Sequence, residues 1–349
     1  MSVLDEIAAE CGVHRRTVSR ILSGQCKETW ASMRGKAELV RKTAKRLGYR
    51  PNAAAKAIST GRFNTIALFQ DTPPRSRGYL PQDLLAGIHS ALGEHDMDLM
   101  LSQFPGLDAP GGPLPRALRE HTVDGFLINY QSVPDYVLRE IERHDIAHVW
   151  INSQLPENAV YPDDRTGTRM LTEHLIAMGH RRIGYLDPGF DFVVAERRHF
   201  SRDARFHGFL DAMRDAGLAP HRLMLSAPPE TMSHTEVASA YRPWLGGNER
   251  VTAVVCYHRS VALSLMYMAS DRYGLRVPDD LSVVATGELQ ASHQEIDVTA
   301  ALLHWDQVGH QAVDMLVGLI DSGKTSAPSR PIKLSLNPGE TACQPTSKQ

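Results

Sequence analysis

Long hydrophobic runs and paired cysteines are both missing from this chain of 349 residues. No run approaches the roughly 18 apolar residues that can span a bilayer, which argues against a membrane protein. The 4 cysteines are scattered and form no C-x-x-C pair, so reduced thiols are the simplest explanation for them. Residues 1–10 are acidic and amphipathic, unlike the basic and then apolar pattern of a secretion signal. We therefore expect a cytoplasmic protein.

Sequence motifs of catalytic and metal sites are missing as well. No G-x-G-x-x-G or P-loop sequence stands in a strand-to-helix turn, and no nucleophile elbow G-x-S-x-G occurs. The 16 histidines form no H-E-x-x-H motif or close Cys/His cluster. Cys11 and His14 are close in sequence, but Cys11 continues an apolar stripe and is better explained as core. We therefore predict no catalytic residue, no metal and no cofactor, and we do not expect an enzyme.

Charge is distributed unevenly, although the formal net charge is only -2. Residues 1–62 hold 13 Lys and Arg against 5 Asp and Glu, a net of +8. The remaining 287 residues carry a net of -10. A basic head on an acidic body indicates that one end of the chain meets a polyanion.

The first part of the basic head has the pattern of two short helices. One apolar stripe at helical spacing consists of Leu4, Ile7, Ala8 and Cys11. Gly12 ends this helix, because glycine accepts the left-handed conformation of a C-cap. A second stripe consists of Val18, Ile21 and Leu22, with an outer face of Arg15, Arg16, Thr17, Ser19 and Arg20. This arrangement is typical of a helix-turn-helix, with an ordinary solvated helical hairpin as the alternative.

The segments that follow carry a specific resemblance. A third helix is predicted over residues 36–47, with Arg41, Lys42, Lys45 and Arg46 facing outward. After it come Leu-Gly-Tyr-Arg-Pro-Asn at 47–52 and an alanine-rich segment that ends at Thr60-Gly61. Together with Thr-Val-Ser-Arg-Ile-Leu at 17–22, these motifs resemble the lactose-repressor (LacI/GalR) family. The resemblance continues more weakly to the C-terminus.

The resemblance implies a DNA-binding role for both parts of the head. It divides the chain into a helix-turn-helix domain over residues 1–50, a hinge helix over 51–61 and an effector-binding and dimerisation domain over 62–349. Arg15 and Arg16 stand where the family reads base edges, and arginine suits guanine, with phosphate contact as the alternative. The positions implied to hold phosphates and set register are Thr17, Ser19 and Arg20.

The hinge also receives its roles from the resemblance. Asn52 is expected to cap the hinge helix, and Lys56 belongs to the implied DNA-binding set. Ile58 stands where the family inserts an apolar wedge into the minor groove, with packing against the body as the alternative. Residues 52–60 are too few for a stable helix in isolation, so DNA and a partner hinge should support it.

Two departures from the family pattern lie in the head. His14 replaces the usual serine N-cap of the recognition helix, and a hydroxyl caps better than an imidazole. The link from Ser23 to Lys36 is about four residues longer than usual in the family and contains Trp30. This side chain has two open interpretations, packing on the head or contact with the DNA backbone.

The acidic body alternates short apolar runs with amphipathic stretches. The expected strands are 65–69, 98–103, 125–129, 147–151, 182–186, 223–226, 253–256 and 282–285. The expected helices are 81–94, 134–144, 167–178, 204–216, 260–272 and 306–322. Such alternation predicts parallel sheets covered by helices. The fold class is therefore an all-α helix-turn-helix head plus an α/β bilobed body, with two Rossmann-like lobes as in periplasmic binding proteins. The lobe boundary is expected near 160, with crossovers near 289–305 and 323–330.

Effector contacts are implied at strand ends, where open α/β folds bind ligands. Asn129 and Asn152 follow two such strands, with turn capping as the alternative. Arg205 can offer several donors to hydroxyls or a carboxylate, unless it pairs with an acidic neighbour such as Asp203. Trp305 offers a flat face for a sugar, unless it is interlobe core.

The chain departs from the family at two further effector positions. Tyr257-His258 stand where the family often has Asn-Asp, and Glu288 lies near the usual position of another carboxylate. Tyr257 and Glu288 therefore join the implied effector set, and the altered pocket suits, for example, an oligosaccharide or an acidic sugar.

The favoured interpretation is a cytoplasmic, dimeric, sequence-specific DNA-binding repressor. Its expected partners are a pseudo-palindromic operator in double-stranded DNA, a second copy of the chain and a small carbohydrate effector between the lobes. The alternative is a regulator that needs no effector, or one that depends on a corepressor, as in the purine-repressor type. A sugar-transport protein is opposed by the basic head.

Overall fold

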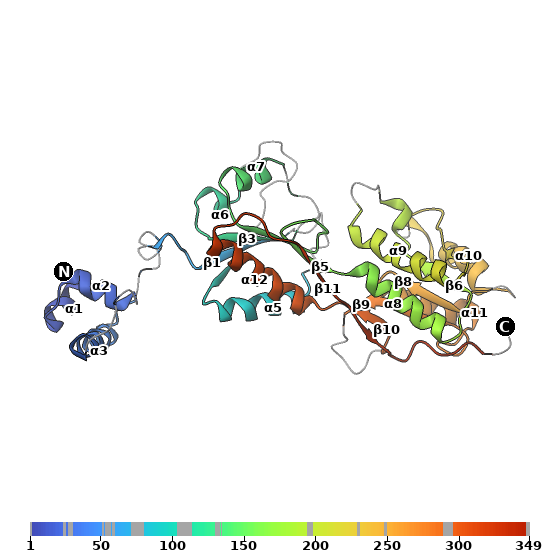
Figure 1. The fold of residues 1–349 in the computed structure, drawn as a ribbon. Coiled ribbons are helices and arrows are strands. Elements are labelled where there is room, and N and C mark those ends of the chain that lie inside the picture. The colour runs from blue at the N-terminus through green and yellow to red at the C-terminus, as the bar shows by residue number, and fades with distance from the viewer. Residues whose placement is uncertain are drawn as a thin grey trace. The chain divides into compact units, whose positions relative to one another are not determined.

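The computed structural model describes two compact units, residues 1–65 with 120–124 and residues 66–119 with 125–349 (Figure 1). The described residues are 2–23, 26, 31–50, 52, 57, 60–70, 80–102, 114–129, 133, 135–193, 198–228, 231–247, 250–288 and 296–346. No helix within these ranges is both long and apolar enough to cross a bilayer.

Three helices form the head, α1 (Val3–Cys11), α2 (Arg15–Leu22) and α3 (Ala31–Arg46). Their buried core consists of Ile7, Val18, Ile21, Ala37, Val40 and Ala44, as the apolar stripes predict. Gly12 ends α1 in the left-handed conformation, with φ 61°. Helix α3 begins five residues before the predicted start at Lys36. Its first turn is mostly exposed, so no apolar stripe marks it in the sequence.

The body contains two six-stranded sheets. The first has the order β11-β5-β4-β3-β1-β2, with strands β1 (Thr65–Gln70), β2 (Asp98–Ser102), β3 (Gly125–Asn129), β4 (His148–Ile151), β5 (Ala159–Pro162) and β11 (Arg330–Ile332). The second has the order β12-β10-β9-β8-β6-β7, with strands β6 (Ile183–Leu186), β7 (His221–Arg222), β8 (Ala253–Cys256), β9 (Ser282–Gly287), β10 (Thr299–Leu302) and β12 (Ser335–Asn337). Strand β12 runs antiparallel to β10, whereas β10, β9, β8, β6 and β7 run parallel.

Helices cover these sheets and bury both faces of the central strands. The helices of the first lobe are α5 (Gln82–Glu94), α6 (Arg116–Arg119), α7 (Asp135–Arg143) and α12 (Trp305–Ser322). Those of the second lobe are α8 (Asp164–Ala177), α9 (Phe200–Asp215), α10 (His234–Leu245) and α11 (Arg259–Tyr273), with a short 3-10 turn at Phe190–Phe192. In β8, Ala253 and Val255 pack with α8 and α9, while Val254 and Cys256 pack with α10 and α11. This explains why the strand reads as a continuous apolar run.

The chain passes between the two sheets three times. It leaves the first sheet after β5, returns from β10 to α12, and leaves again between β11 and β12. The stretch 323–330, where the sequence suggested a crossover, leads instead into β11 of the first sheet. The predicted class, a helix-turn-helix head with an α/β bilobed body, is confirmed.

Most predicted elements of the body are confirmed, and the errors have different causes. The strand predicted at 223–226 is wrong, because the paired residues are His221 and Arg222. Leu223 and Leu225 are buried beside α10, although they lie just after β7 and not in it. Their burial explains the apolar alternation that predicted a strand. Four strands of three or four residues, β5, β10, β11 and β12, were not predicted, and neither was α10. Such short strands carry too little periodicity to be recognised.

Two glycines allow α5 and α12 to approach closely. A Cβ at Gly309 would overlap the carbonyl oxygen of Leu84, and one at Gly87 would overlap that of Asp306. We expect Gly309→Ala to lower the free energy of unfolding by about 1–3 kcal/mol, since the backbone must shift to admit the methyl group. Urea unfolding followed by circular dichroism measures this change.

Gly318→Ala is the matched control on the same helix. Gly318 is exposed, and no described atom lies within 4 Å of a Cβ built there. Alanine should therefore stabilise this site by about 0.5–1 kcal/mol through helix propensity. Equal destabilisation by the two substitutions would contradict the close-packing explanation.

Candidate DNA interface and ligand site

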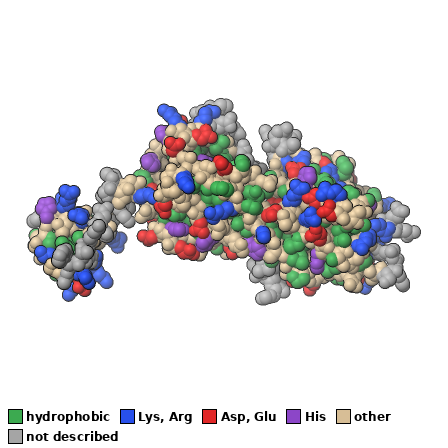
Figure 2. All heavy atoms as spheres, in the orientation of Figure 1, with side chains coloured by type: hydrophobic (Ala, Val, Ile, Leu, Met, Phe, Trp, Pro, Cys, Tyr) green, Lys and Arg blue, Asp and Glu red, His purple; other side chains and the backbone are tan. Residues whose placement is uncertain are grey.

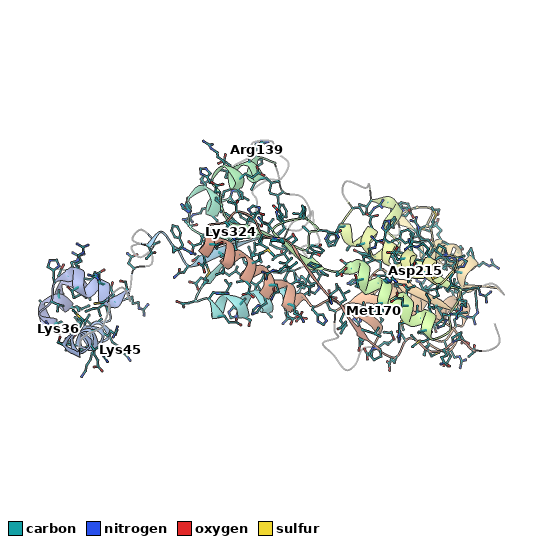
Figure 3. All side chains as sticks on the ribbon, viewed as in Figure 1. Lys36, Lys45, Arg139, Met170, Asp215 and Lys324 are labelled. Carbon is teal, nitrogen blue, oxygen red and sulfur yellow. The ribbon has the colours of Figure 1, made fainter. Side chains whose placement is uncertain are left out.

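The outer face of α2 presents the side chains expected to meet DNA. Arg15, Arg16, Ser19 and Arg20 are exposed, and Thr17 is half-buried. Lys36 and Lys45 add positive charge on α3 (Figure 3). Many Lys and Arg side chains are visible on this view of the head (Figure 2). The head therefore has the charge and the exposed helix that a phosphate backbone requires.

The N-terminus of α2 is capped by an imidazole. Nδ1 of His14 accepts a hydrogen bond from the backbone N–H of Arg16 at 3.2 Å. The residue that departs from the family pattern thus still satisfies one amide at the helix start, as a neutral ring can.

Arg15 and Arg16 differ in their surroundings. The guanidinium of Arg15 lies 3.5 Å from the Asp5 carboxylate of α1. In the described part of the chain, no ion-pair or hydrogen-bond partner is recorded for the Arg16 guanidinium. Exposed pairs such as Arg15–Asp5 are weak, but this one orients Arg15 toward its own head. Arg16 is the freer of the two for a base.

The structure describes only one of the three hinge residues that the resemblance assigns to DNA binding. Asn52 is described and exposed, whereas Lys56 and Ile58 lie outside the described residues, as does Trp30 of the longer link. Their implied roles remain predictions.

In the body, Asn129 and Asn152 are both found at strand ends. Asn129 faces Gln70 across β3 and β1, and its side-chain amide donates to Gln70 Oε1 at 2.7 Å. Asn152 follows β4 with φ 58°, in the left-handed region that asparagine tolerates. Its backbone carbonyl accepts a hydrogen bond from His199 Nε2 at 3.0 Å. Asn152 therefore contacts His199 through its backbone carbonyl.

Arg205 is buried and fully engaged within the second lobe. Its Nε donates to Asp164 Oδ1 at 2.6 Å, and Nη1 donates to the carbonyl oxygen of Tyr257 at 2.6 Å. The ion-pair partner is Asp164 on α8, and Asp203 pairs with Arg198 instead. Burial raises the pKa of Asp164, and the Arg205 guanidinium opposes that rise.

The Tyr257 ring lies beside two guanidinium groups. The guanidinium carbons of Arg202 and Arg205 lie 4.7 Å and 4.5 Å from the ring centroid. Arg202 in turn pairs with Asp187, which directly follows β6. Burial raises the pKa of Asp187, while Arg202 lowers it. Two buried carboxylates therefore neutralise the two cations beside the ring.

Glu288 and Trp305 meet near the start of α12. Trp305 Nε1 donates to Glu288 Oε1 at 3.0 Å, and Glu288 Oε2 lies 3.7 Å from His258 Nε2. Trp305 is only 5% exposed and belongs to the core of the first lobe. Its indole is thus largely core of the first lobe, where the alternative interpretation expected interlobe core, and one polar edge is bound to Glu288.

Several buried oxygens in the second lobe have no hydrogen-bond partner among the residues that the structure describes. They include Oδ2 of Asp164, Oδ2 of Asp187 and the hydroxyls of Tyr185 and Thr286. Tyr185 and Asp187 are at the end of β6, and Thr286 is at the end of β9. Unsatisfied buried polar atoms are costly, so their concentration at the strand ends indicates a ligand or water site. We call these four residues, together with Arg202, Arg205 and Tyr257, the polar cluster.

The structure thus joins Arg205 with Tyr257, and Glu288 with Trp305, while Asn129 is bonded to Gln70. The sequence-based set missed several residues of the cluster and its surroundings: Asp164, Tyr185, Asp187, His199, Ser201 and Arg202. Burial and contacts in the structure identify them.

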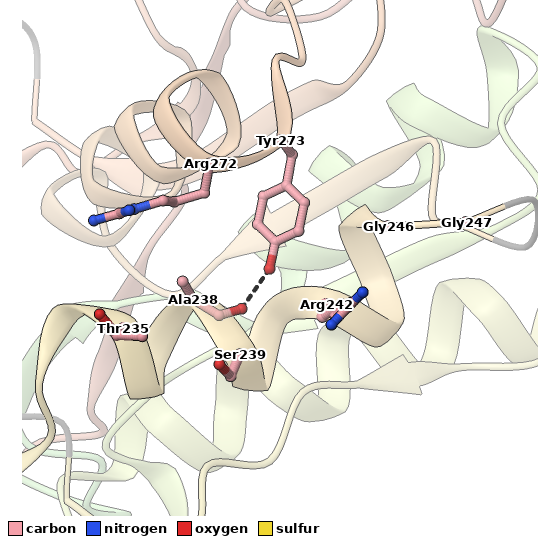
Figure 4. A pocket seen from close by; sticks show the side chains of 8 residues that line it. All are labelled: Thr235, Ala238, Ser239, Arg242, Gly246, Gly247, Arg272 and Tyr273. Carbon is pink, nitrogen blue, oxygen red and sulfur yellow. Dashed lines mark hydrogen bonds between the residues drawn. The ribbon is translucent and has the colours of Figure 1, made fainter.

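A recess also lies between α10 and α11 (Figure 4). Thr235, Ser239, Arg242 and Arg272 line it, and the Tyr273 hydroxyl donates to the Ala238 carbonyl there. Arg242 and Arg272 belong to the last turns of their helices, where cations complement the negative helix end. The residues of this recess do not overlap the polar cluster.

Comparison with known proteins bears on both regions. Residues 172–342 match the model of a periplasmic binding protein-like domain. The regulator CelR of Thermobifida fusca is 29% identical, over 94% of both chains, and GalR of Escherichia coli K12 is 27% identical, over 84% of this chain and 81% of GalR. A lac repressor dimer bound to operator and an anti-inducer has a TM-score of 0.70 at 22% identity, covering 98% of this chain and 99% of that chain.

Along most of its length, the chain is therefore similar to transcriptional regulators of the LacI/GalR family. These relatives are HTH-type transcriptional regulators and not enzymes. A crystal structure of a LacI-family regulator from Mycobacterium smegmatis shares 26% identity with a TM-score of 0.57, over 80% of this chain and 100% of that chain.

The Arg205–Asp164 pair yields a stability prediction. Asp164→Ala removes the partner of a buried guanidinium, so we expect the free energy of unfolding to fall by about 3–5 kcal/mol. Urea unfolding of the full chain measures this loss.

Asp203→Ala is the control, because Asp203 lies on α9 like Arg205 and its carboxylate belongs to a partly exposed pair with Arg198. Its cost should stay below about 1 kcal/mol. Similar losses for the two variants would mean that the buried pair does not hold α8 and α9 together.

Proposed function

We propose that this regulator is a repressor whose two copies hold a pseudo-palindromic operator and release it when a small neutral sugar binds the polar cluster. The observation that carries the ligand half is the set of buried, unpartnered oxygens beside Tyr257. The proposal places the protein in the cytoplasm, where DNA is accessible.

Hydrogen-bonding chemistry favours a polyhydroxylated ligand. The free carboxylate oxygens of Asp164 and Asp187 can only accept, and the hydroxyls of Tyr185 and Thr286 can accept or donate. Sugar hydroxyls supply both donors and acceptors in a small volume. A solved structure of a CelR–cellobiose complex has a TM-score of 0.59 at 21% identity to this chain.

Charge favours a neutral ligand over an acid. Both guanidiniums beside Tyr257 are already paired with buried carboxylates. An added carboxylate would face the unpartnered oxygens of Asp164 and Asp187, and Arg202 and Arg205 are both already paired. The acidic sugar suggested by the sequence is therefore disfavoured relative to a neutral mono- or oligosaccharide.

DNA recognition is assigned to α2 and the hinge. Arg16 is proposed to read a base edge, with Arg15, Thr17, Ser19 and Arg20 on phosphates or neighbouring bases. Asn52, Lys56 and Ile58 are proposed to act at the centre of the operator, where Ile58 would wedge into the minor groove. Two copies of the chain would place two such helices in successive major grooves.

Control of DNA affinity requires that the ligand bind two states of the body unequally. A coupling free energy of about 1–3 kcal/mol is typical. The ligand would stabilise a lobe arrangement that no longer supports the paired hinges, whose short helices depend on their partners.

The ligand half is tested by calorimetric titration of the full chain with galactose, cellobiose, galacturonate and a purine base. We expect a neutral sugar to bind and the uronic acid to bind more weakly. Tyr257→Ala should weaken that binding at least tenfold, about 1.4 kcal/mol, because a wall of the cluster is lost.

Tyr267→Ala on α11 is the control, since that ring is 62% exposed in the same lobe. Its affinity should match the wild type. Tighter binding of the acid, or of the purine, would replace the neutral-sugar proposal.

The DNA half is tested by selecting operators from a random library. Arg16→Ala should relax the preference at one position of each half-site by about 1–3 kcal/mol. Arg139→Ala on α7 is the control, an exposed arginine in the body. An unchanged preference in Arg16→Ala would refute base reading by this side chain.

A further inference from the structure

His199 connects the polar cluster of the second lobe to the first lobe. It is the N-cap of α9, and its Nε2 lies 3.0 Å from the carbonyl oxygen of Asn152, directly after β4. Its Nδ1 lies 2.7 Å from Ser201 Oγ, which in turn lies 2.9 Å from the Tyr257 hydroxyl. One imidazole thus stands between a first-lobe strand end and a ring of the polar cluster.

The chemistry of each partner determines which group donates in the hydrogen bonds from Asn152 through His199 and Ser201 to Tyr257. A carbonyl oxygen can only accept, so Nε2 of His199 donates to Asn152. Nδ1 of the neutral ring then accepts from the Ser201 hydroxyl and from the Ser201 backbone N–H at 3.3 Å. Because the Ser201 proton is directed to Nδ1, the Tyr257 hydroxyl donates to Ser201. The Tyr257 oxygen keeps its lone pairs for a ligand hydroxyl.

We propose that His199 is a positioning residue that orients the Tyr257 hydroxyl as an acceptor and fastens the ligand site to the Asn152 carbonyl of the first lobe. This inference rests on the proposed ligand function of the polar cluster. It explains how occupancy of that cluster reaches the first lobe: a ligand that moves Tyr257 also moves Ser201 and the imidazole.

The connection requires a neutral imidazole. A proton on Nδ1 would turn it into a donor facing the Ser201 N–H, and the serine and tyrosine hydroxyls would have to reverse. The charged and titratable groups that face His199 are Arg202 and Arg205 on α9 and Tyr257 after β8, while β4 contributes the neutral Asn152 carbonyl and β5 places Tyr161 against Phe200. Both arginines oppose a further positive charge.

Burial lowers the pKa of His199 to about 4 from its ordinary value of 6.5, with Arg205 and Arg202 acting in the same direction. Above pH 6.5 the ring is neutral in the folded and unfolded chain, so the connection is intact. As the pH falls from 6.5 to 4, the unfolded chain takes up the proton first and the folded state is disfavoured. The unfolding constant should rise by up to about tenfold per pH unit in this window.

Three variants of the full chain separate positioning from simple helix capping. His199→Ala removes both bonds of the ring. His199→Gln keeps a donor and an acceptor but does not titrate. His207→Gln is the control, an exposed histidine on the same helix that contacts the Asp203 carbonyl.

The first measurement needs no ligand. Hydrogen–deuterium exchange should rise at least tenfold in His199→Ala, both at the start of α9 and in first-lobe residues 148–155. It should remain near wild type in His199→Gln and His207→Gln. Faster exchange confined to α9 would show a local cap and overturn the proposal.

The second measurement is the imidazole ¹⁵N spectrum of the histidine-labelled full chain. The signal that His199→Gln removes should have the Nε2–H form and stay neutral down to about pH 5. A protonated ring at pH 7, or the Nδ1–H form, would overturn the proposal.

The third measurement is titration with galactose and cellobiose at pH 7.5. If a sugar binds the wild type, its affinity should fall at least tenfold in His199→Ala and be restored to within about threefold in His199→Gln. Unchanged affinity in His199→Ala would overturn the positioning role. Absence of sugar binding by the wild type would count against the sugar-ligand function, whereas the exchange and imidazole measurements would still decide the connection to Asn152.

Discussion

The burial of Arg205 is the constraint on which the second lobe depends. A guanidinium sealed between helices and a sheet must find acceptors in fixed directions, or the fold loses several kilocalories per mole. Arg205 finds them in the Asp164 carboxylate and the Tyr257 carbonyl, and its flat face lies over the Tyr257 ring. These contacts fix the start of α8, the first turns of α9 and the end of β8 relative to one another.

The same constraint shapes the chemistry available to a ligand. Because Arg202 and Arg205 are each matched by a carboxylate, the cluster has polarity without excess positive charge. The carboxylate oxygens that the arginines do not use remain as acceptors. A buried, balanced site of this kind discriminates by the placement of hydroxyl groups more than by charge.

Imidazole capping recurs at the starts of three helices. At the starts of α2, α9 and α11, Nδ1 of the N-cap histidine accepts a hydrogen bond from a backbone N–H two residues later. The pairs are His14 with Arg16 at 3.2 Å, His199 with Ser201 at 3.3 Å and His258 with Ser260 at 3.3 Å. Only the neutral ring can accept in this way, and its other nitrogen is free to donate. A serine or aspartate cap would satisfy the helix better, but its short side chain would not extend to a second element. At His199 that extension reaches Asn152.

The sequence by itself determined the head, the fold class and the positions at strand ends. Apolar stripes such as Leu4–Cys11 are local patterns, and buried parallel strands such as Ala253–Cys256 need a continuous apolar run whatever their neighbours are. The sequence also placed Arg205 and Tyr257 in one site through family resemblance. It could not identify Asp164 as the partner of Arg205, because 41 residues separate them and Asp203 was nearer in the chain. Nor could it show that Trp305 is core, that Asn152 acts through its backbone, or that His199 joins the lobes. Those roles depend on which groups burial leaves without water, and only the tertiary structure decides that.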